Sequence, residues 1–186
     1  MIVDGPTAAT FIRNYKALLL HIAERAQSSS GVLDRMHIGR KAVLEKPALL
    51  ESAQMALKGT PDAIDEDFVE ALTTLQVKHW VYLRDTRSHS IFIESSGTAA
   101  YAVLGLTNKI RDIIGGIGAY IETGLVRFRG HYLCDGLISQ VVWLGPNYKR
   151  DFNATLRTLR SEGQFLGAAH PALPADGPRA ARSARR

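Results

Sequence analysis

Glu122 and Asp135 are the two residues whose types and spacing best suit catalytic chemistry in this chain. Arg129-Gly130 lies between them and has the composition of a two-residue hairpin loop. Counting back along the two strands places Gly124 opposite Asp135, so that Glu122 lies diagonally across from Asp135 on the same face. Two carboxylates in that arrangement suit a shared metal ion or an activated water molecule.

A structural interpretation of the same pair is the main alternative. Asp135 is followed by Gly136, and Asp-Gly is a strong hairpin-turn signal because both residues tolerate positive φ. In that interpretation Asp135 only makes the turn, and Glu122 points to solvent at a strand end. A register shift of one residue would also move the two carboxylates to opposite faces of the sheet.

A second candidate set consists of His79, Asp85 and His89, which belong to two neighbouring strands. Two imidazoles and a carboxylate are plausible ligands for a divalent metal, although the spacing matches no established metal motif. The alternative is that the histidines are exposed on an edge strand and that Asp85 forms a turn.

Three arginines, Arg150, Arg157 and Arg160, share one face of a C-terminal helix, and more arginines follow in residues 167–186. A continuous positive patch would bind nucleic acid or an acidic protein, with an affinity that falls steeply with salt. The alternative is an ordinary solvated helix face.

Two other features favour structure over chemistry. The glycine-rich stretch Ile114–Gly118 leaves a helix and enters a strand, whereas a phosphate-binding loop leads from a strand into a helix. The single cysteine, Cys134, points to the opposite face of its strand from His131, so we expect a small buried residue without a catalytic partner. No cofactor site is predicted.

The strands that would position these residues fall into two groups around a short helix, which begins near Thr107 and ends at Gly115. Alternating and β-branched residues predict an antiparallel meander before the helix and a second meander after it. Both faces of residues 117–128 are largely apolar, so we expect cover on both sides of the sheet. The predicted strands are 77–84, 89–94, 98–106, 117–128, 131–134 and 137–144.

Helical periodicity predicts four helical segments before the sheet and one after it. The fourth should begin at Thr60-Pro61, with Thr60 as the N-cap and proline at the first helical position. The last follows Gly145 and should bury Tyr148, Phe152, Leu156 and Leu159. The other helical segments are expected at 4–26, 32–45 and 48–58. These elements together predict an α+β fold.

Length, charge and composition restrict the domain organisation and the cellular location of the protein. The 186 residues suit one domain, with a helical part at 1–76, a β-rich part at 77–166 and a disordered basic tail at 167–186. Of the net charge of +5, the tail carries +3. One cysteine, the lack of an export signal and the lack of a long apolar run predict a cytoplasmic protein without a membrane segment.

The function expected from these patterns is non-enzymatic, because the evidence for catalysis is weak. We expect a binding or regulatory protein that acts through protein-protein contacts with a partner or with a second copy of itself. The alternatives are a metal-dependent hydrolase that uses Glu122 and Asp135, a nucleic-acid-associated protein that uses the basic helix and tail, and a small-ligand sensor with an internal pocket.

Overall fold

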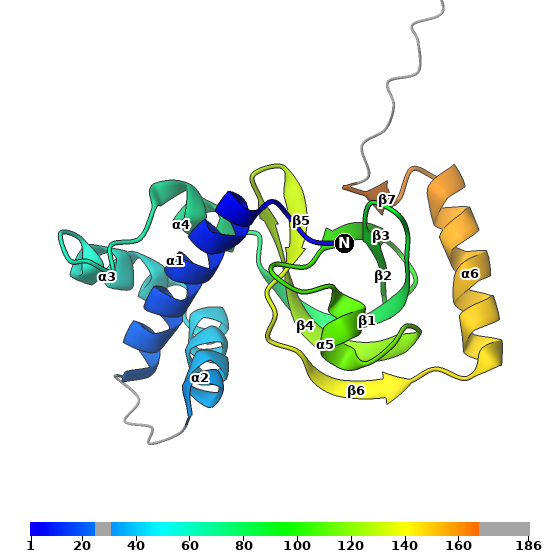
Figure 1. Ribbon diagram of the computed structural model, residues 1–186, viewed down its shortest axis with the longest axis horizontal. Coiled ribbons are helices and arrows are strands. Elements are labelled where there is room, and N and C mark those ends of the chain that lie inside the picture. Colours follow the sequence, from blue (N-terminus) through cyan, green and yellow to red (C-terminus); the bar gives the residue numbers. More distant parts are fainter. Residues whose placement is uncertain (25–30, 168–186) are drawn as a thin grey trace, which may run out of the picture.

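The computed structural model describes residues 1–24 and 31–167 of the chain. Four helices come first, a strand-rich segment follows, and a long helix lies near the C-terminal end of the described chain (Figure 1). The α+β class predicted from the sequence is confirmed. The helices are α1 (Gly5–Glu24), α2 (Val32–Glu45), α3 (Ala48–Leu57), α4 (Glu66–Leu72), α5 (Ile110–Ile114) and α6 (Pro146–Ser161).

Five of the strands close into a barrel. β1, β2 and β3 form the antiparallel meander expected from the sequence, and β4 returns to pair with the free side of β1. β5 then pairs antiparallel with β4 and parallel with β3, which completes the circle. The strands are β1 (Gln76–Asp85), β2 (Ser90–Glu94), β3 (Ala100–Leu104), β4 (Ala119–Phe128), β5 (His131–Cys134), β6 (Ser139–Trp143) and β7 (Phe165–Leu166).

The order of strands in this barrel defines its topology. β4, β1, β2 and β3 lie side by side in that order, which is a Greek key. With β5 between β3 and β4 and with a helix between β3 and β4 in the chain, the connectivity is that of the five-stranded OB barrel. A barrel of this kind has been used for many functions, so its topology assigns none by itself.

Alternate residues of each strand fill the barrel. Trp80, Tyr82, Phe92 and Ile121 point inward and are fully buried. α5 closes one end, because Ile110 inserts into the same cluster. This interior explains why both faces of the strands are apolar: one face lines the barrel, and the other is covered from outside.

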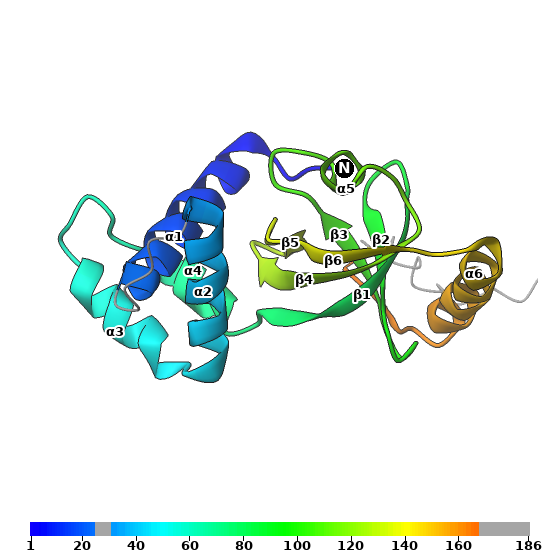
Figure 2. The same cartoon turned by 90° about the horizontal axis from the view of Figure 1, so that it is seen from below.

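The outside of the barrel is covered in two places. The N-terminal helices pack on the outer face of β4 and β5, where Phe11, Phe68 and Phe128 form an aromatic cluster. On the opposite side, α6 packs Leu156 and Leu159 on the outer face of β1 and β2. Figure 2 shows the barrel between these two covers, with β6 running beside β4 towards α6.

The second meander predicted from the sequence differs from the structure. Residues 135–136 do not form a hairpin turn, because β5 and β6 do not pair with each other and both run antiparallel along the same side of β4. Asp135 and Gly136 instead interrupt one long strand. The Asp135 side chain points to the outer face of the barrel, where it accepts hydrogen bonds from Tyr15 and Arg40 of the covering helices, which a hairpin signal in the sequence does not predict.

Two predictions about the helices also differ from the structure. α4 begins at Glu66 rather than near Thr60, because the Thr60 hydroxyl bonds to the carbonyl oxygen of Leu57 and ends the preceding turn. Tyr148 of α6 is 64% exposed and not buried, whereas the inward positions of Leu156 and Leu159 are confirmed.

No helix in residues 1–24 and 31–167 combines the length and apolar character needed to cross a membrane. The tail predicted to be disordered, 167–186, lies outside the described residues except for Gly167.

Candidate functional site

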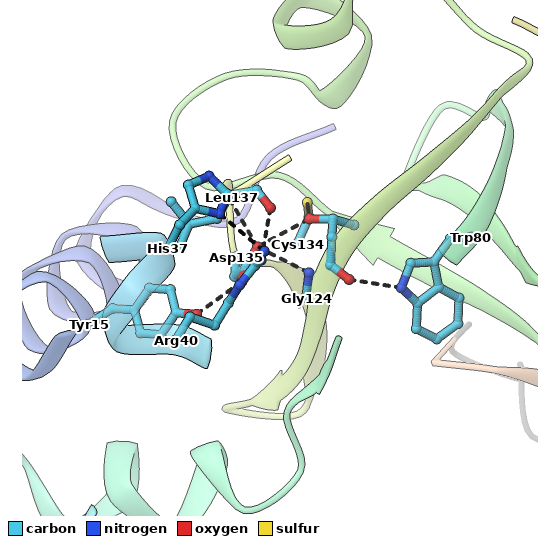
Figure 3. A network of polar contacts seen from close by, with 9 residues as sticks. Tyr15, His37, Arg40, Trp80, Gly124, Cys134, Asp135 and Leu137 are labelled. Carbon is cyan, nitrogen blue, oxygen red and sulfur yellow. Dashed lines mark hydrogen bonds and ion pairs between the residues drawn. The ribbon is translucent and has the colours of Figure 1, made fainter. Parts of the chain in front are cut away.

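Asp135 is the centre of a buried polar network that joins the helices to the barrel (Figure 3). Its Oδ2 accepts hydrogen bonds from the Tyr15 hydroxyl of α1 and from Nη1 of Arg40 of α2, both at 2.9 Å. Its Oδ1 accepts three more, from the Thr123 hydroxyl and from the backbone N–H groups of Gly124 and Leu137. The side chains of Arg40 and Asp135 are almost completely buried.

This arrangement gives Asp135 a structural role. Five donors occupy the carboxylate, and the guanidinium of Arg40 neutralises its charge, so little capacity remains for a substrate or a metal ion. Burial, and after it the charge of Asp135, raise the pKa of the Tyr15 hydroxyl well above its usual value, which keeps Tyr15 a neutral donor.

Cys134 lies beside this network and is fully buried. Burial, and after it the charge of Asp135, raise the pKa of the Cys134 thiol to about 12. Because the thiolate is the nucleophilic form, Cys134 is an inert core residue at neutral pH.

Glu122 lies on the outer face of β4, and Asp135, which follows β5 and lies opposite Gly124, is on the same face of the sheet but in different surroundings. The pairing of Phe128 with His131 continues to Leu125 and Cys134, so the register inferred from Arg129-Gly130 is the one observed. Asp135 is covered by the helices, whereas the Glu122 side chain is 28% exposed. The nearest partner described for Glu122 is His79, whose Nε2 is 3.9 Å from Glu122 Oε2.

His79 belongs to a polar cluster on the outside of β1, β4 and β6. It lies directly across from Glu122 in the β1–β4 pairing, and its ring stacks on that of Tyr120 at 5.3 Å and 9°. Its Nε2 is also 2.8 Å from Oε1 of Gln140. Three strands therefore contribute to this cluster, which contains one residue from each of the two candidate sets found in the sequence.

The other members of the second candidate set lie elsewhere. Asp85 accepts hydrogen bonds of 2.7 Å from the hydroxyls of Tyr82 and Ser90 at the far end of β1. His89 lies in the β1–β2 turn, where Ser88 Oγ is 2.9 Å from its Nδ1. In the described part of the chain, no group of three or more His, Cys, Asp and Glu side chains is arranged to hold a metal ion.

His89 contacts the C-terminal segment of the described chain. Its ring packs on Phe165 of β7, with 5.6 Å between the centroids, and its Nε2 is buried without a hydrogen-bond partner among the described residues. Burial, and after it the positive charge of Arg160, lower the pKa of His89 below its usual value.

The stability of the fold should therefore depend on the ionisation of His89. Because the unfolded chain binds a proton on His89 at a higher pH than the folded chain does, the free energy of unfolding should fall as the pH drops below about 6.5. We expect His89→Phe to reduce this fall. Urea unfolding of both proteins between about pH 7.5 and pH 5 measures it, and identical pH dependence in the two would contradict the assignment.

β6 is exposed in a way that distinguishes it from the strands of the barrel. Its three consecutive apolar residues Val141, Val142 and Trp143 are 41%, 58% and 52% exposed. Val142 pairs with Tyr120 and shares its outer face, whereas Trp143 pairs with Ala119 and packs its ring against Gly116 on the other face. Apolar side chains are thus exposed on both sides of one strand.

The outer edge of β6 also has no strand beside it. β6 pairs only with β4 and ends the strand order among the described residues. The N–H of Leu144 donates to the carbonyl oxygen of Gly118, next to β4, so the backbone groups of the preceding Trp143 point away from β4. The free edge of β6 therefore presents backbone hydrogen-bonding groups and exposed apolar side chains side by side, and both can contact a binding partner.

A β-bulge lies near the N-terminal end of β6. Gln140 and Val141 together lie opposite Ile121, and Gln140 has a φ of +52°, a left-handed conformation that is unfavourable for residues other than glycine. The bulge directs the Gln140 side chain to His79, although the two residues are 61 positions apart.

The arginines of α6 lie on its exposed face. Arg150 is 3.5 Å from Asp151, and the guanidinium of Arg160 lies over the ring of Phe165 at 4.8 Å, while Arg157 is exposed. OB barrels commonly bind nucleic acid on the outer face of β2 and β3. Here that face carries Ile91 and Ile93 and is covered by α6, so nucleic-acid binding stays a prediction that depends on the arginines.

The sequence alone does not single out Tyr15, Arg40 and Gln140 as members of these sites, nor does it show the exposure of β6. Arg40 has the one detectable signal, because a charged residue falls there between Met36 and Val43 on the apolar side of a predicted helix. Gln140 has none, since its role depends on a bulge in the β4–β6 pairing.

Comparison of the chain with protein-family models, with curated proteins and with solved structures found no match.

Proposed function

We propose that this protein is a non-enzymatic binding module that adds an extended segment of a partner protein to the free edge of β6. The observation that supports this most is β6 itself, an edge strand with Val141, Val142 and Trp143 exposed in sequence. In strand addition, the backbone of the partner supplies hydrogen bonds and its alternate side chains pack on the two faces of the edge.

The composition of the edge supports a partner. Residues 137–144 contain no charged residue and no proline. Edge strands that stay unpaired are usually protected by lysine, proline or a covering segment, because a bare apolar edge promotes unwanted pairing. β6 has neither kind of protecting residue, which favours an edge that is occupied when the protein acts.

The surroundings of the edge suit an apolar peptide segment. Ile113 and Ile117, which lie in and after α5, are 47% and 45% exposed. Gly116, between them, contacts the ring of Trp143, so this apolar surface adjoins β6 on the side of α5. Such clusters of exposed apolar residues are typical of protein-binding sites.

Selection from a random peptide-display library tests this proposal. We expect the wild-type protein to enrich peptides with alternating apolar residues that adopt an extended conformation. Val142→Lys should weaken the binding of these peptides by about tenfold or more, because a lysine replaces an apolar contact at the edge. Met55→Lys is the matched control, since Met55 is exposed on α3, away from β6.

Thermal melts of both variants should match that of the wild type, because both side chains are largely exposed. Peptides that bind Val142→Lys as tightly as the wild type would contradict the proposal, and so would a selection that enriches no peptide.

A further inference from the structure

We propose that His79, Glu122 and Gln140 form a binding site for Zn²⁺ or a similar divalent cation that prefers mixed nitrogen and oxygen ligands. The site lies on the outer face of β1, β4 and β6, next to the free edge that the proposed function uses, but none of its three ligands is one of the exposed edge residues Val141, Val142 and Trp143. The inference goes beyond that function and does not depend on it.

The geometry places two oxygen atoms beside one imidazole nitrogen. Nε2 of His79 is 2.8 Å from Oε1 of Gln140 and 3.9 Å from Oε2 of Glu122. Zinc binds nitrogen and oxygen at about 2.0–2.2 Å, so ligands in a tetrahedral site lie about 3.3–3.5 Å from each other. The two observed separations bracket that value, and shifts of about half an ångström bring both oxygens to ligand distance.

The backbone holds these three side chains in position. His79 and Glu122 are directly paired across β1 and β4, and the ring of Tyr120 stacks on the imidazole. Gln140 reaches the site from the bulge, where its backbone adopts the left-handed conformation. Unfavourable backbone conformations of this kind concentrate at functional sites, where the rest of the structure maintains them.

The exposure of the site suits a bound cation with water in its remaining positions. The side chains of His79 and Glu122 are 41% and 28% exposed, so they can move slightly, and water has access. The donor set is one imidazole, one carboxylate and one amide oxygen. Mg²⁺ and Ca²⁺ prefer six or more oxygen ligands, whereas an imidazole nitrogen favours Zn²⁺ and its neighbours.

A bound cation would connect β6 to the barrel. It would join β1, β4 and β6 through side chains and would fix the bulge at Gln140. The three ligands lie together in the folded chain but not in the unfolded chain. Zn²⁺ should therefore also raise the melting temperature of the protein.

Isothermal titration of tag-free protein with ZnCl₂ tests the inference. We expect one ion per chain and a loss of affinity of about tenfold or more in His79→Gln, which keeps a polar side chain but removes the imidazole. Glu122→Gln and Gln140→Gly should each weaken binding as well, and glycine at position 140 also accepts the positive φ. His131→Gln is the matched control, because His131 is exposed at the opposite end of β4.

Three results would overturn the inference: no binding of ZnCl₂, binding that His79→Gln leaves unchanged, or binding that His79→Gln removes but Glu122→Gln and Gln140→Gly do not affect. Peptide binding measured in the presence of a chelator is a separate experiment, so failure of the zinc site and failure of the proposed function can be distinguished.

Discussion

Asp135→Ala should lower the free energy of unfolding by about 3–5 kcal/mol, because it leaves the guanidinium of Arg40 buried without its partner. It also removes the acceptor of the Tyr15 hydroxyl and of two backbone N–H groups, those of Gly124 and Leu137. An unsatisfied buried donor costs free energy of its own. Urea unfolding at neutral pH, followed by tryptophan fluorescence, measures the change.

The network predicts an asymmetry between its two charged residues. Arg40→Met leaves the buried Asp135 carboxylate without its counter-charge and the carbonyl oxygen of Leu137 without the Arg40 donor. Four donors still stabilise the carboxylate, however, from Tyr15, Thr123, Gly124 and Leu137. Arg40→Met should therefore destabilise the protein less than Asp135→Ala does. Equal effects of the two variants, or an Asp135→Ala protein as stable as the wild type, would contradict the role assigned to Asp135.

Asp112→Ala is the matched control for a change of charge. Asp112 forms an exposed ion pair with Arg111, and exposed pairs contribute little to stability. We expect the unfolding curve of this variant to coincide closely with that of the wild type.

Gly39→Ala should lower the free energy of unfolding by about 2 kcal/mol, although alanine is the better helix former by about 1 kcal/mol. Gly39 lies where α2 crosses α1, and a Cβ atom there would be 2.3 Å from the carbonyl oxygen of Leu19. This neighbour is backbone, so the clash cannot be relieved by a change of rotamer. The two helices must move apart, which costs more than the gain in helix propensity.

Gly5→Ala is the control for this substitution. Gly5 begins α1, and a Cβ atom there would meet no other atom within 4 Å. Thermal melts should show a lower melting temperature for Gly39→Ala and little change for Gly5→Ala. A melting temperature of Gly39→Ala at or above that of the wild type would show that α1 and α2 do not pack as closely as described.

The elements were predictable from the sequence because their signals are local. Apolar periodicity indicated the helices and most strands, and Arg129-Gly130 indicated the hairpin that sets the register of β4 and β5. The closure of the barrel was not predictable, because it depends on pairing of β1 with β4 and of β3 with β5, which are distant in sequence. From the sequence, Gly39 is only a residue with low helix propensity. Its role becomes clear when the structure shows the backbone of Leu19 packed against it.

The candidate site was predictable only in part, for a related physical reason. Residue type and strand parity identified His79, Glu122 and Asp135 as candidates and placed the two acids on the same face of the sheet. They did not show that α1 and α2 cover Asp135 while Glu122 stays exposed beside His79. The same limit applies to β6, because Leu137–Leu144 reads as an ordinary apolar strand, and only the fold shows that part of it is uncovered.

Amide hydrogen exchange at Trp143 tests the central claim most directly, because the backbone groups of this residue point away from β4 towards the free edge. It is measured by NMR on the protein alone and with a peptide selected on it. Strand addition predicts that exchange at Trp143 slows markedly when the peptide binds. Unchanged exchange at Trp143 in the saturated complex would contradict it and would place the binding surface elsewhere on the protein.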